Sequence, residues 1–321
     1  MFFIVFANTL IYPVFAQSPT CAYCGEPILG YYVTIDGKPY HEACSWKILP
    51  RCAICGKMIE SNYVRFEGKD YHRSCYYNEV APRCDVCGEP LSGKYRTDFW
   101  GLKYHIEHEA ELPRCDYCMR LISEGTTGGG RIYSDGRHLC NICFETAVMA
   151  DSEVKSARYF VLGLLHGNGI DFNKENIDIS LVDVPSLKQV SGADFDLNEM
   201  GFCKFEFTLV DKDTIEKNNT IYILSGLPEL VFKGVLAHEM MHAWMNLSGI
   251  HDLPLDICEG SANYASYLVY ATNNDKFAEY LIKNLDENPD PVYGEGFRKV
   301  KAIVSGNGIN NWLKYLRDQN H

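Results

Sequence analysis

The stretch from Cys52 to Cys75 reads CAICGKMIESNYVRFEGKDYHRSC and is one unit of a repeat. It opens with two cysteines separated by two residues and closes with His72 and Cys75. A Cys-x2-Cys turn supplies two thiolates from one tight loop, and the closing pair completes the four tetrahedral ligands that zinc prefers. The spacing therefore predicts a small unit that is held together by zinc.

The same pattern occurs four times at nearly equal spacing, and it contains all but two of the 14 cysteines. The closing octets GKPYHEAC, GKDYHRSC, GLKYHIEH and GRHLCNIC carry Cys or His at the same two positions. The predicted ligand sets are Cys21, Cys24, His41 and Cys44; Cys52, Cys55, His72 and Cys75; Cys84, Cys87, His105 and His108; and Cys115, Cys118, Cys140 and Cys143.

A disulfide framework is the alternative interpretation of these cysteines, and an exported chain would permit one. Disulfides do not explain histidines at matched positions of the repeat. Because each set has four protein ligands and no open position, the sites are expected to be structural. Units this small bury little apolar surface, so metal would supply much of their folding energy. We predict four structural zinc ions, in LIM-like units at 21–75 and 84–143.

The charge balance argues against one common role of zinc modules. The chain has a formal net charge of −12, and the repeat region is itself slightly acidic. Nucleic acids and anionic membranes select basic surfaces. We therefore expect the array to contact proteins and not nucleic acid.

Residues 1–16, MFFIVFANTLIYPVFA, are apolar and uncharged. The run is short for a membrane span, and Val14-Phe15-Ala16 resembles a signal-peptidase site. This predicts a signal peptide over 1–16 and a secreted or periplasmic protein. No Lys or Arg precedes the run, so a membrane anchor is the alternative.

The cysteine density falls after Cys143, which predicts a boundary near Ala150 and a second domain over 150–321. Alternation of apolar residues predicts strands, and apolar residues spaced by three and four predict helices. The expected strands are Gly201–Leu209 and Thr220–Leu224, and the expected helices are Phe144–His166, Leu230–Asn246, Asp256–Ala271, Lys276–Asn284 and Gly296 to the C-terminus. Strands followed by helices indicate an α+β domain that is mainly helical.

One of these helices contains LAHEMMHAW, from Leu236 to Trp244. On a helix, His238 and His242 lie one turn apart on the same face and can reach one Zn²⁺. Glu239 points about 100° away, where it can act on a bound water without ligating the metal. The alternative is a core helix whose histidines have ordinary hydrogen-bond partners.

A catalytic zinc needs a third protein ligand. Met245 and Ser248 exclude the HExxHxxGxxH pattern. We predict Glu259 as the third ligand, because a buried carboxylate near the start of an apolar helix would be costly without a partner. Asp256 and His251 are weaker alternatives. Asn263, one turn after Glu259, could hydrogen-bond a zinc-bound histidine.

Several stretches resemble the plant LIM-domain peptidases that limit organ size, the "DA-one" family. They are YHRSCYYNEVAPRCDVC, DGRHLCNICFETAVM, SGLPELVFKGVLAHEMMHAW, CEG around Glu259, and PVYGEGFRKV. The resemblance implies a zinc peptidase domain of the gluzincin type behind LIM-like modules. The units here are further apart than in a standard LIM domain. We expect an exported member that lacks the ubiquitin-binding helices of the plant proteins.

Together these observations predict a zinc-dependent endopeptidase whose array recruits or gates protein substrates. His238, His242 and Glu259 would hold the catalytic zinc, and Glu239 would be the general base. Tyr293 is a candidate oxyanion donor, and the strand Thr220–Leu224 a candidate substrate-binding strand. The alternative function is a non-catalytic scaffold protein with a purely structural metal site. Cys203 and Cys258 are expected to be buried thiols, with a disulfide between them as the alternative.

Overall fold

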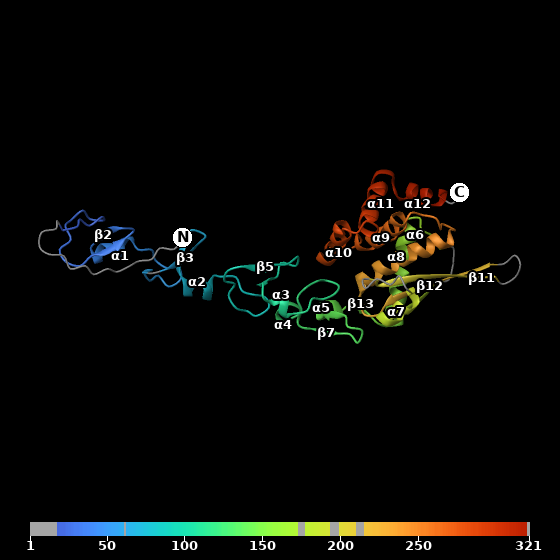
Figure 1. Cartoon of the computed structure of the whole chain (residues 1–321), viewed down its shortest axis with the longest axis horizontal. Helices are drawn as coiled ribbons and strands as arrows, with labels where there is room; N and C mark the ends of the chain where they lie inside the picture. Colours follow the sequence, from blue (N-terminus) through green and yellow to red (C-terminus); the bar gives the residue numbers. More distant parts are fainter. Residues whose placement is uncertain (1–17, 61, 173–176, 193–198, 210–214, 320–321) are drawn as a thin grey trace. The chain divides into compact units, whose positions relative to one another are not determined.

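The computed structural model describes residues 18–60, 62–172, 177–192, 199–209 and 215–319 (Figure 1). The predicted signal peptide, residues 1–16, lies outside the described residues. The chain divides into two compact units, Met1–Arg96 with Lys103–Ile106, and Thr97–Leu102 with Glu107–His321. The domain boundary near Ala150 was predicted from the fall in cysteine density after Cys143, and it stays a prediction.

The four repeats have the same local structure. Each begins with an isolated β-bridge around its Cys-x2-Cys turn, at Thr20↔Pro27, Arg51↔Met58, Arg83↔Pro90 and Arg114↔Leu121. A two-stranded hairpin and a short helix follow. The hairpins and helices are β1 (Val33–Ile35), β2 (Lys38–Tyr40) and α1 (Glu42–Ile48); β3 (Tyr63–Phe66), β4 (Lys69–His72) and α2 (Arg73–Glu79); β5 (Tyr95–Thr97), β6 (Lys103–His105) and α3 (His108–Glu111); and β7 (Gly130–Ile132), β8 (His138–Cys140) and α5 (Asn141–Phe144), with α4 (Glu124–Thr127) before β7.

The C-terminal unit contains a three-stranded sheet in the order β10–β12–β11. Strand β10 (Ile177–Val182) runs parallel to β12 (Ile215–Leu224), and β11 (Gly201–Leu209) runs antiparallel to it, with Cys203 opposite Ile221. The prediction that Thr220–Leu224 accepts a substrate strand is wrong. That stretch pairs with β10 on one side and β11 on the other, so its backbone groups already have partners.

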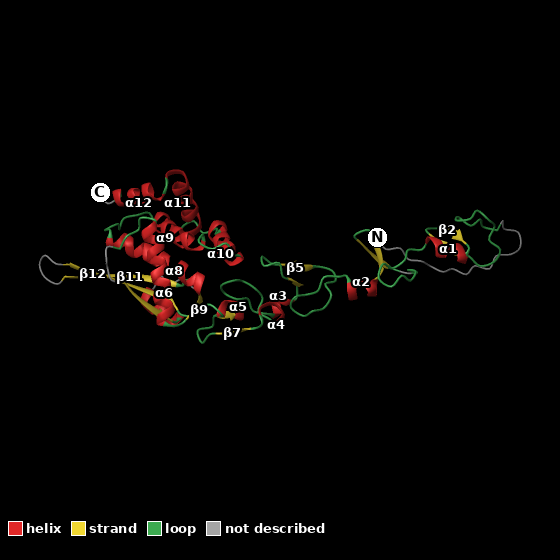
Figure 2. Cartoon of the chain, turned by 180° about the vertical axis from the view of Figure 1, so that it is seen from behind, coloured by secondary structure: helices red, strands yellow, loops and turns green. Residues whose placement is uncertain are grey.

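Helices make up most of the rest of this unit, as Figure 2 shows, and the α+β class is confirmed. They are α6 (Asp151–Gly167), α7 (Val184–Ser191), α8 (Glu229–Leu247), α9 (Leu255–Tyr270), α10 (Lys276–Glu287), α11 (Tyr293–Asn307) and α12 (Ile309–Asp318). Among the described residues, none of the helices combines the length and the apolar character that a membrane crossing requires.

Helix α8 lies at the centre of the C-terminal unit and packs against α6, α9, β11 and β12. Its start is fixed by a two-stranded pairing, in which β13 (Leu227–Pro228) pairs with β9 (Ala147–Val148). The backbone N–H of Glu229, the first residue of α8, also donates to the carbonyl of Thr146. The residues that directly follow the fourth repeat therefore hold the N-terminal end of α8.

Helices α9 and α11 cross at two glycines. A Cβ on Gly260 would lie 2.4 Å from the backbone carbonyl group of Gly296, and one on Gly296 would lie 2.2 Å from the carbonyl oxygen of Asp256. Real Cβ atoms do not approach other atoms so closely, so both positions require glycine. This close crossing holds α11 against α9 next to Glu259 and explains Gly260 in CEG and Gly296 in YGEG.

Candidate metal centres

Helix α8 is buried on most of its surface, as its apolar sequence predicts, and it carries two histidines on the side that faces α9. The side chains of His238 and His242 are 16% and 17% exposed, and that of Glu259 from α9 is 13% exposed. Helix α8 is therefore a core helix, and both of its histidines contact the predicted carboxylate of Glu259.

The three side chains converge through one atom each. Nε2 of His238 and Nε2 of His242 are 3.1 Å apart, and Oε2 of Glu259 lies 3.3 Å from the first and 3.5 Å from the second. A tetrahedral zinc with bonds of about 2.0–2.1 Å would separate its ligand atoms by about 3.3 Å. The donor types and the spacing both fit a zinc ion, and this set is one of five metal-compatible clusters among the described residues.

Glu239 lies beside this cluster without being part of it. Its side chain is buried, at 6% residue exposure, and burial raises the pKa of its carboxyl group, while the two histidines and the backbone N–H of Cys203 act in the opposite direction. A Cβ on Gly201 would lie 2.9 Å from Oε1 of Glu239. Glycine at the start of β11 therefore lets the strand approach this carboxylate.

The charges in the cluster stabilise one another. Burial would raise the pKa of Glu259, but the contacts with His238 and His242 outweigh burial and hold the pKa below its usual range. Burial would lower the pKa of His242, but contacts with Cys258 and Glu259 raise it above its usual value. The site is thus arranged to keep a carboxylate ionised between two imidazoles, an environment that also suits a cation.

The alternatives for the third ligand have other contacts. Asp256 accepts a hydrogen bond of 2.9 Å from Nζ of Lys299, and the ring of His251 stacks on Phe205 with centroids 6.2 Å apart. Neither belongs to the cluster around His238. Tyr293, the first residue of α11, is 44% exposed, and its carbonyl oxygen accepts a hydrogen bond from Asn263.

Two side chains of α9 also contact Nδ1 of the two histidines, the ring nitrogen that faces away from the cluster. Oδ1 of Asn263 lies 3.1 Å from Nδ1 of His238, as its spacing from Glu259 suggested. Sγ of Cys258 lies 3.6 Å from Nδ1 of His242. Apart from its place directly before Glu259, no feature of the sequence pointed to Cys258 for this contact.

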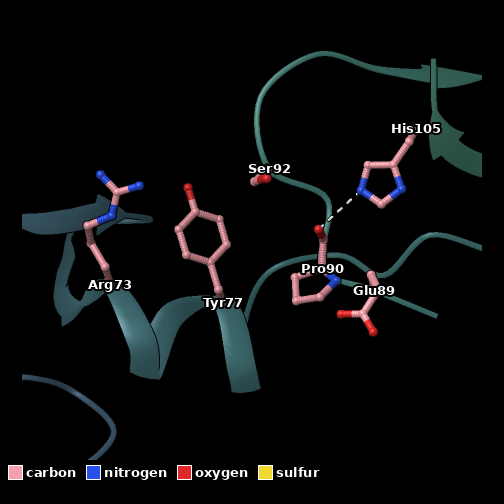
Figure 3. A pocket seen from close by; sticks show the side chains of 6 residues that line it. All are labelled: Arg73, Tyr77, Glu89, Pro90, Ser92 and His105. Atoms are coloured by element: carbon pink, nitrogen blue, oxygen red, sulfur yellow. Dashed lines mark hydrogen bonds between the residues drawn. The ribbon is translucent and has the colours of Figure 1, made fainter. Parts of the chain in front are cut away.

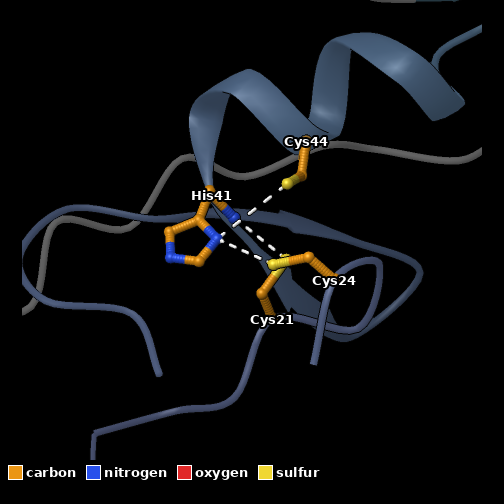
Figure 4. Close-up of side chains that lie close together, drawn as sticks. All are labelled: Cys21, Cys24, His41 and Cys44. Atoms are coloured by element: carbon orange, nitrogen blue, oxygen red, sulfur yellow. Dashed lines mark hydrogen bonds between the residues drawn. The ribbon is translucent and has the colours of Figure 1, made fainter. Parts of the chain in front are cut away.

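The structure brings together all four predicted Cys/His sets of the repeats. Within each set, the potential ligand atoms lie within 4.8 Å of one another. In the first set, shown in Figure 4, Nδ1 of His41 lies 3.4 Å from Sγ of Cys24 and 3.9 Å from Sγ of Cys44. Zinc bonds of about 2.3 Å to sulfur and 2.0–2.1 Å to nitrogen would give separations near these values. Such clusters suggest zinc binding.

The array histidines use the opposite ring nitrogen from those of α8. In the first two sets Nδ1 faces the thiols, while Nε2 of His41 lies 3.3 Å from the carbonyl oxygen of Pro27 and Nε2 of His72 lies 3.0 Å from that of Met58. A backbone carbonyl only accepts, so Nε2 carries the proton and Nδ1 offers its lone pair to a metal.

The fourth set differs from the others in composition and burial. All of its ligands are cysteines, and each is at most 3% exposed. Sγ of Cys118 and Sγ of Cys140 are 3.7 Å apart, which is a non-bonded distance and close to the spacing of thiolates on one zinc. His138, near the end of the repeat, is not part of the set.

All 14 cysteines lie in the described part of the chain, and each is a free thiol there. The disulfide alternatives are therefore not what the structure shows. Sγ of Cys203 donates to Oδ1 of Asn219 over 3.7 Å, and burial raises the pKa of the Cys203 thiol.

A shallow hollow occurs in the N-terminal unit, beside one of the Cys/His sets (Figure 3). It is lined by Arg73, Tyr77, Glu89, Pro90, Ser92 and His105. Arg73 and Glu89 bring opposite charges to its lining, so the hollow favours neither an anionic nor a cationic ligand.

Comparison with known proteins finds a family model and several curated proteins that are similar to this chain. A family model described as "DA1-like: Protein DA1" matches residues 208–271, which include β12, α8 and α9. The chain is DA1-like. This confirms the resemblance that the sequence motifs indicated.

The relatives are plant proteins. "Protein DA1-related 7" of Arabidopsis thaliana is 28% identical over 285 residues, covering 70% of this chain and 50% of the relative. "Protein DA1" of the same plant is 26% identical, covering 70% and 52%, and "LIM domain-containing protein HDR3" of Oryza sativa subsp. japonica is 26% identical, covering 70% and 57%. This DA1-like chain spans about half the length of these curated relatives.

Proposed function

We propose that this DA1-like protein is a zinc-dependent endopeptidase of the gluzincin type that hydrolyses peptide bonds of protein substrates. One observation carries the proposal. Nε2 of His238, Nε2 of His242 and Oε2 of Glu259 converge at 3.1–3.5 Å, with the buried carboxylate of Glu239 beside them. A structural site needs no such fourth group, whereas hydrolysis needs a base next to the metal.

Three ligands leave one position of a tetrahedral zinc open, which distinguishes this site from the four closed Cys/His sets. When bound there, zinc would supply Lewis-acid activation of a water molecule and of the substrate carbonyl. In total the proposal assigns one catalytic and four structural zinc ions to the chain, the structural ions to the four Cys/His sets of the repeats.

Glu239 takes a proton from the attacking water and delivers it to the amine that leaves as the C–N bond breaks. Its burial supports this role, because burial raises the pKa of its carboxyl group and so makes the carboxylate a stronger base toward the water. Tyr293 is the candidate for stabilising the oxyanion, since its backbone is tied to Asn263 beside His238.

Strand β11 is the better candidate for holding an extended substrate. Within the described residues it pairs with β12 alone, and Gly201 at its start lies against Glu239. A substrate strand that adds to this edge would have its backbone aligned beside the base.

The zinc array is proposed to recognise or gate protein substrates. In the first repeat, Leu29 and Tyr31 are each 86% exposed and Trp46 is 50% exposed. Aromatic side chains such as those of Tyr31 and Trp46 are enriched in protein-binding surfaces. Export of the chain, with cleavage after Ala16, is part of the same proposal, and N-terminal sequencing of the mature protein tests it.

The test of the peptidase proposal is Glu239→Gln, assayed on denatured casein with the full chain. We expect at least about a 10²-fold loss of activity, because general acid–base catalysis typically contributes 10²–10⁴-fold. Glu229→Gln is the matched control, because Glu229 lies on the same helix but pairs with Lys233 at 2.7 Å on the surface.

The control should cleave casein at the wild-type rate. Full activity of Glu239→Gln would refute the mechanism. A folded, zinc-loaded wild type that cleaves no protein would favour the scaffold function instead.

A further inference from the structure

Helix α9 contributes more to the candidate catalytic centre than the third ligand. Asn263 lies one helical turn after Glu259, on the same side of α9, and the residue is only 9% exposed. Its amide oxygen Oδ1 lies 3.1 Å from Nδ1 of His238, and its amide nitrogen Nδ2 lies 3.0 Å from the carbonyl oxygen of Tyr293. The side chain thus spans the space between a histidine of α8 and the first residue of α11.

The contact with Tyr293 determines which way the amide faces. A backbone carbonyl oxygen can only accept a hydrogen bond, so the NH₂ group of Asn263 must point to it. The amide oxygen then faces His238. Because an amide oxygen can only accept, Nδ1 of His238 must carry a proton and donate it to Asn263.

This proton position has a consequence for the other ring nitrogen. In a neutral imidazole only one nitrogen carries a proton, so Nε2 of His238 has a free lone pair. That lone pair points to the place where Nε2 of His242 and Oε2 of Glu259 converge. The two hydrogen bonds, from His238 to Asn263 and from Asn263 to the Tyr293 carbonyl, therefore prepare His238 to bind metal.

We infer that Asn263 is the positioning residue of the catalytic zinc, fixing the tautomer and ring orientation of His238 and tying that histidine to the N-terminal end of α11. The inference rests on the proposed function, because it concerns the metal of that site. It is specific to this chain's own side chains and does not depend on which substrate is cut.

His242 makes a weaker contact of the same kind with Cys258. Nδ1 of His242 faces Sγ of Cys258 at 3.6 Å, and sulfur is a weak hydrogen-bond acceptor. Asn263 makes the shorter of the two contacts and is itself held by a second hydrogen bond. His238 should therefore depend on its partner more strongly than His242 depends on Cys258.

The experiment compares two substitutions at one position. Asn263→Leu keeps a similar volume but removes both polar atoms, whereas Asn263→Asp keeps an oxygen that can accept from His238. Zinc per chain is measured in the full-length protein over a series of chelator-buffered free Zn²⁺ concentrations. His242→Ala identifies which step of the titration belongs to the catalytic ion.

Ser266→Ala is the matched control. Ser266 also lies on α9, is 5% exposed, and donates a hydrogen bond of 2.8 Å to the carbonyl of Gly234 on α8. Its loss weakens the same helix–helix contact at a distance from the histidines. Circular dichroism and the melting temperature confirm that each variant is folded.

We expect Asn263→Leu to weaken binding of the catalytic ion by about 10–100-fold, the usual effect of losing the outer partner of a zinc-bound histidine. Asn263→Asp and Ser266→Ala should bind it as the wild type does. Unchanged affinity in folded Asn263→Leu would overturn the inference, as would equal losses in Asn263→Leu and Asn263→Asp.

A different result would refute the proposed function itself. If wild type and His242→Ala hold the same amount of zinc at every free Zn²⁺ concentration, the chain has no catalytic ion and Asn263 has none to position. If Asn263→Leu fails to fold, Asn263→Asp still decides the question: it should retain the ion, and a folded Asn263→Asp that loses it would overturn the role of the acceptor oxygen.

Discussion

The first and fourth repeats use the same cysteine turn in different surroundings. In the first, Cys24 is exposed and Cys44 is partly exposed, and the set includes a histidine. In the fourth, all four cysteines are buried in a core that also contains residues of α6, α8 and α9. The same metal-binding pattern therefore serves a small hairpin unit in one place and the interior of a larger fold in the other.

The contacts around the fourth repeat explain this difference. Tyr133 donates a hydrogen bond of 3.3 Å to the carbonyl of Gly226, and the backbone N–H of Gly226 donates to the carbonyl of Val148. These contacts lie directly before α8. The carboxylate of Asp135, bound to Arg137, also accepts from the backbone N–H of Val184 at the start of α7. The fourth repeat is thus built into the unit that carries the HEMMH helix.

The largest expected difference between the two repeats is the effect of losing a metal ligand. Cys140→Ser should unfold much of the C-terminal unit, because structural zinc contributes about 10 kcal/mol or more, which matches or exceeds the stability of a typical domain. Cys44→Ser should leave that unit folded. Hydrogen exchange of the α8 backbone amides, followed by mass spectrometry, measures both effects. Equal protection of α8 in the two variants would contradict the comparison.

A smaller difference is expected for the ion pairs of the repeats. Asp135 and Arg137 have side chains only 4% and 12% exposed, whereas Arg65, which pairs with Asp70 in the second repeat, is 64% exposed. Asp135→Ala leaves a buried cation with one partner fewer and should cost about 3 kcal/mol in the free energy of unfolding. Asp70→Ala should change it little, because exposed pairs contribute little. Chemical denaturation followed by tryptophan fluorescence provides the measurement.

The contribution of Asp135 should also depend on pH. Burial would raise its pKa, but the hydrogen bonds and charge of Arg137 outweigh burial and lower it. A carboxyl group whose pKa is lowered by folding stabilises the protein above its unfolded pKa of about 3.9 and loses this contribution as the pH falls through the folded pKa. The difference between wild type and Asp135→Ala should therefore shrink in acid. A difference that grows as the pH falls would show that the ion pair is not its cause.

The smallest expected effect concerns Tyr133. Tyr133→Phe removes its hydrogen bond to Gly226 and keeps the ring, so the free energy of unfolding should fall by about 1 kcal/mol. The melting temperature of the C-terminal unit should drop by a few degrees. An unchanged melting temperature would show that the backbone pairing of β9 with β13 holds the start of α8 without this side chain.

Much of the fold could be predicted where the pattern is local. The bounds of β11 match the alternating stretch Gly201–Leu209, and α8, α9 and α10 fall close to the predicted ranges. The four Cys/His sets and the trio of His238, His242 and Glu259 also gather as the spacing predicted. Within each Cys-x2-Cys turn, and between His238 and His242 on one helix, the distance along the chain nearly fixes the distance between the side chains.

Predictions failed where a partner far along the chain decides the structure. The helix expected from Phe144 begins at Asp151, because Ala147 and Val148 pair with β13 and Glu153 accepts the backbone N–H groups of Met149 and Ala150. Strand β10 and helix α7 were not predicted, and the last expected helix divides at Gly308, whose φ of 79° interrupts the helix. Such pairings and breaks depend on neighbours that a local pattern does not contain.

The sequence by itself determined which residues could bind metal, since ligand type and spacing are local properties of the chain. Tertiary structure decided what surrounds each set, because burial and outer hydrogen bonds come from elements far apart in the sequence. It placed Cys115 and its three partners in a core and left Cys24 exposed. It also brought Asn263 between His238 and Tyr293, a contact that needs three helices to meet.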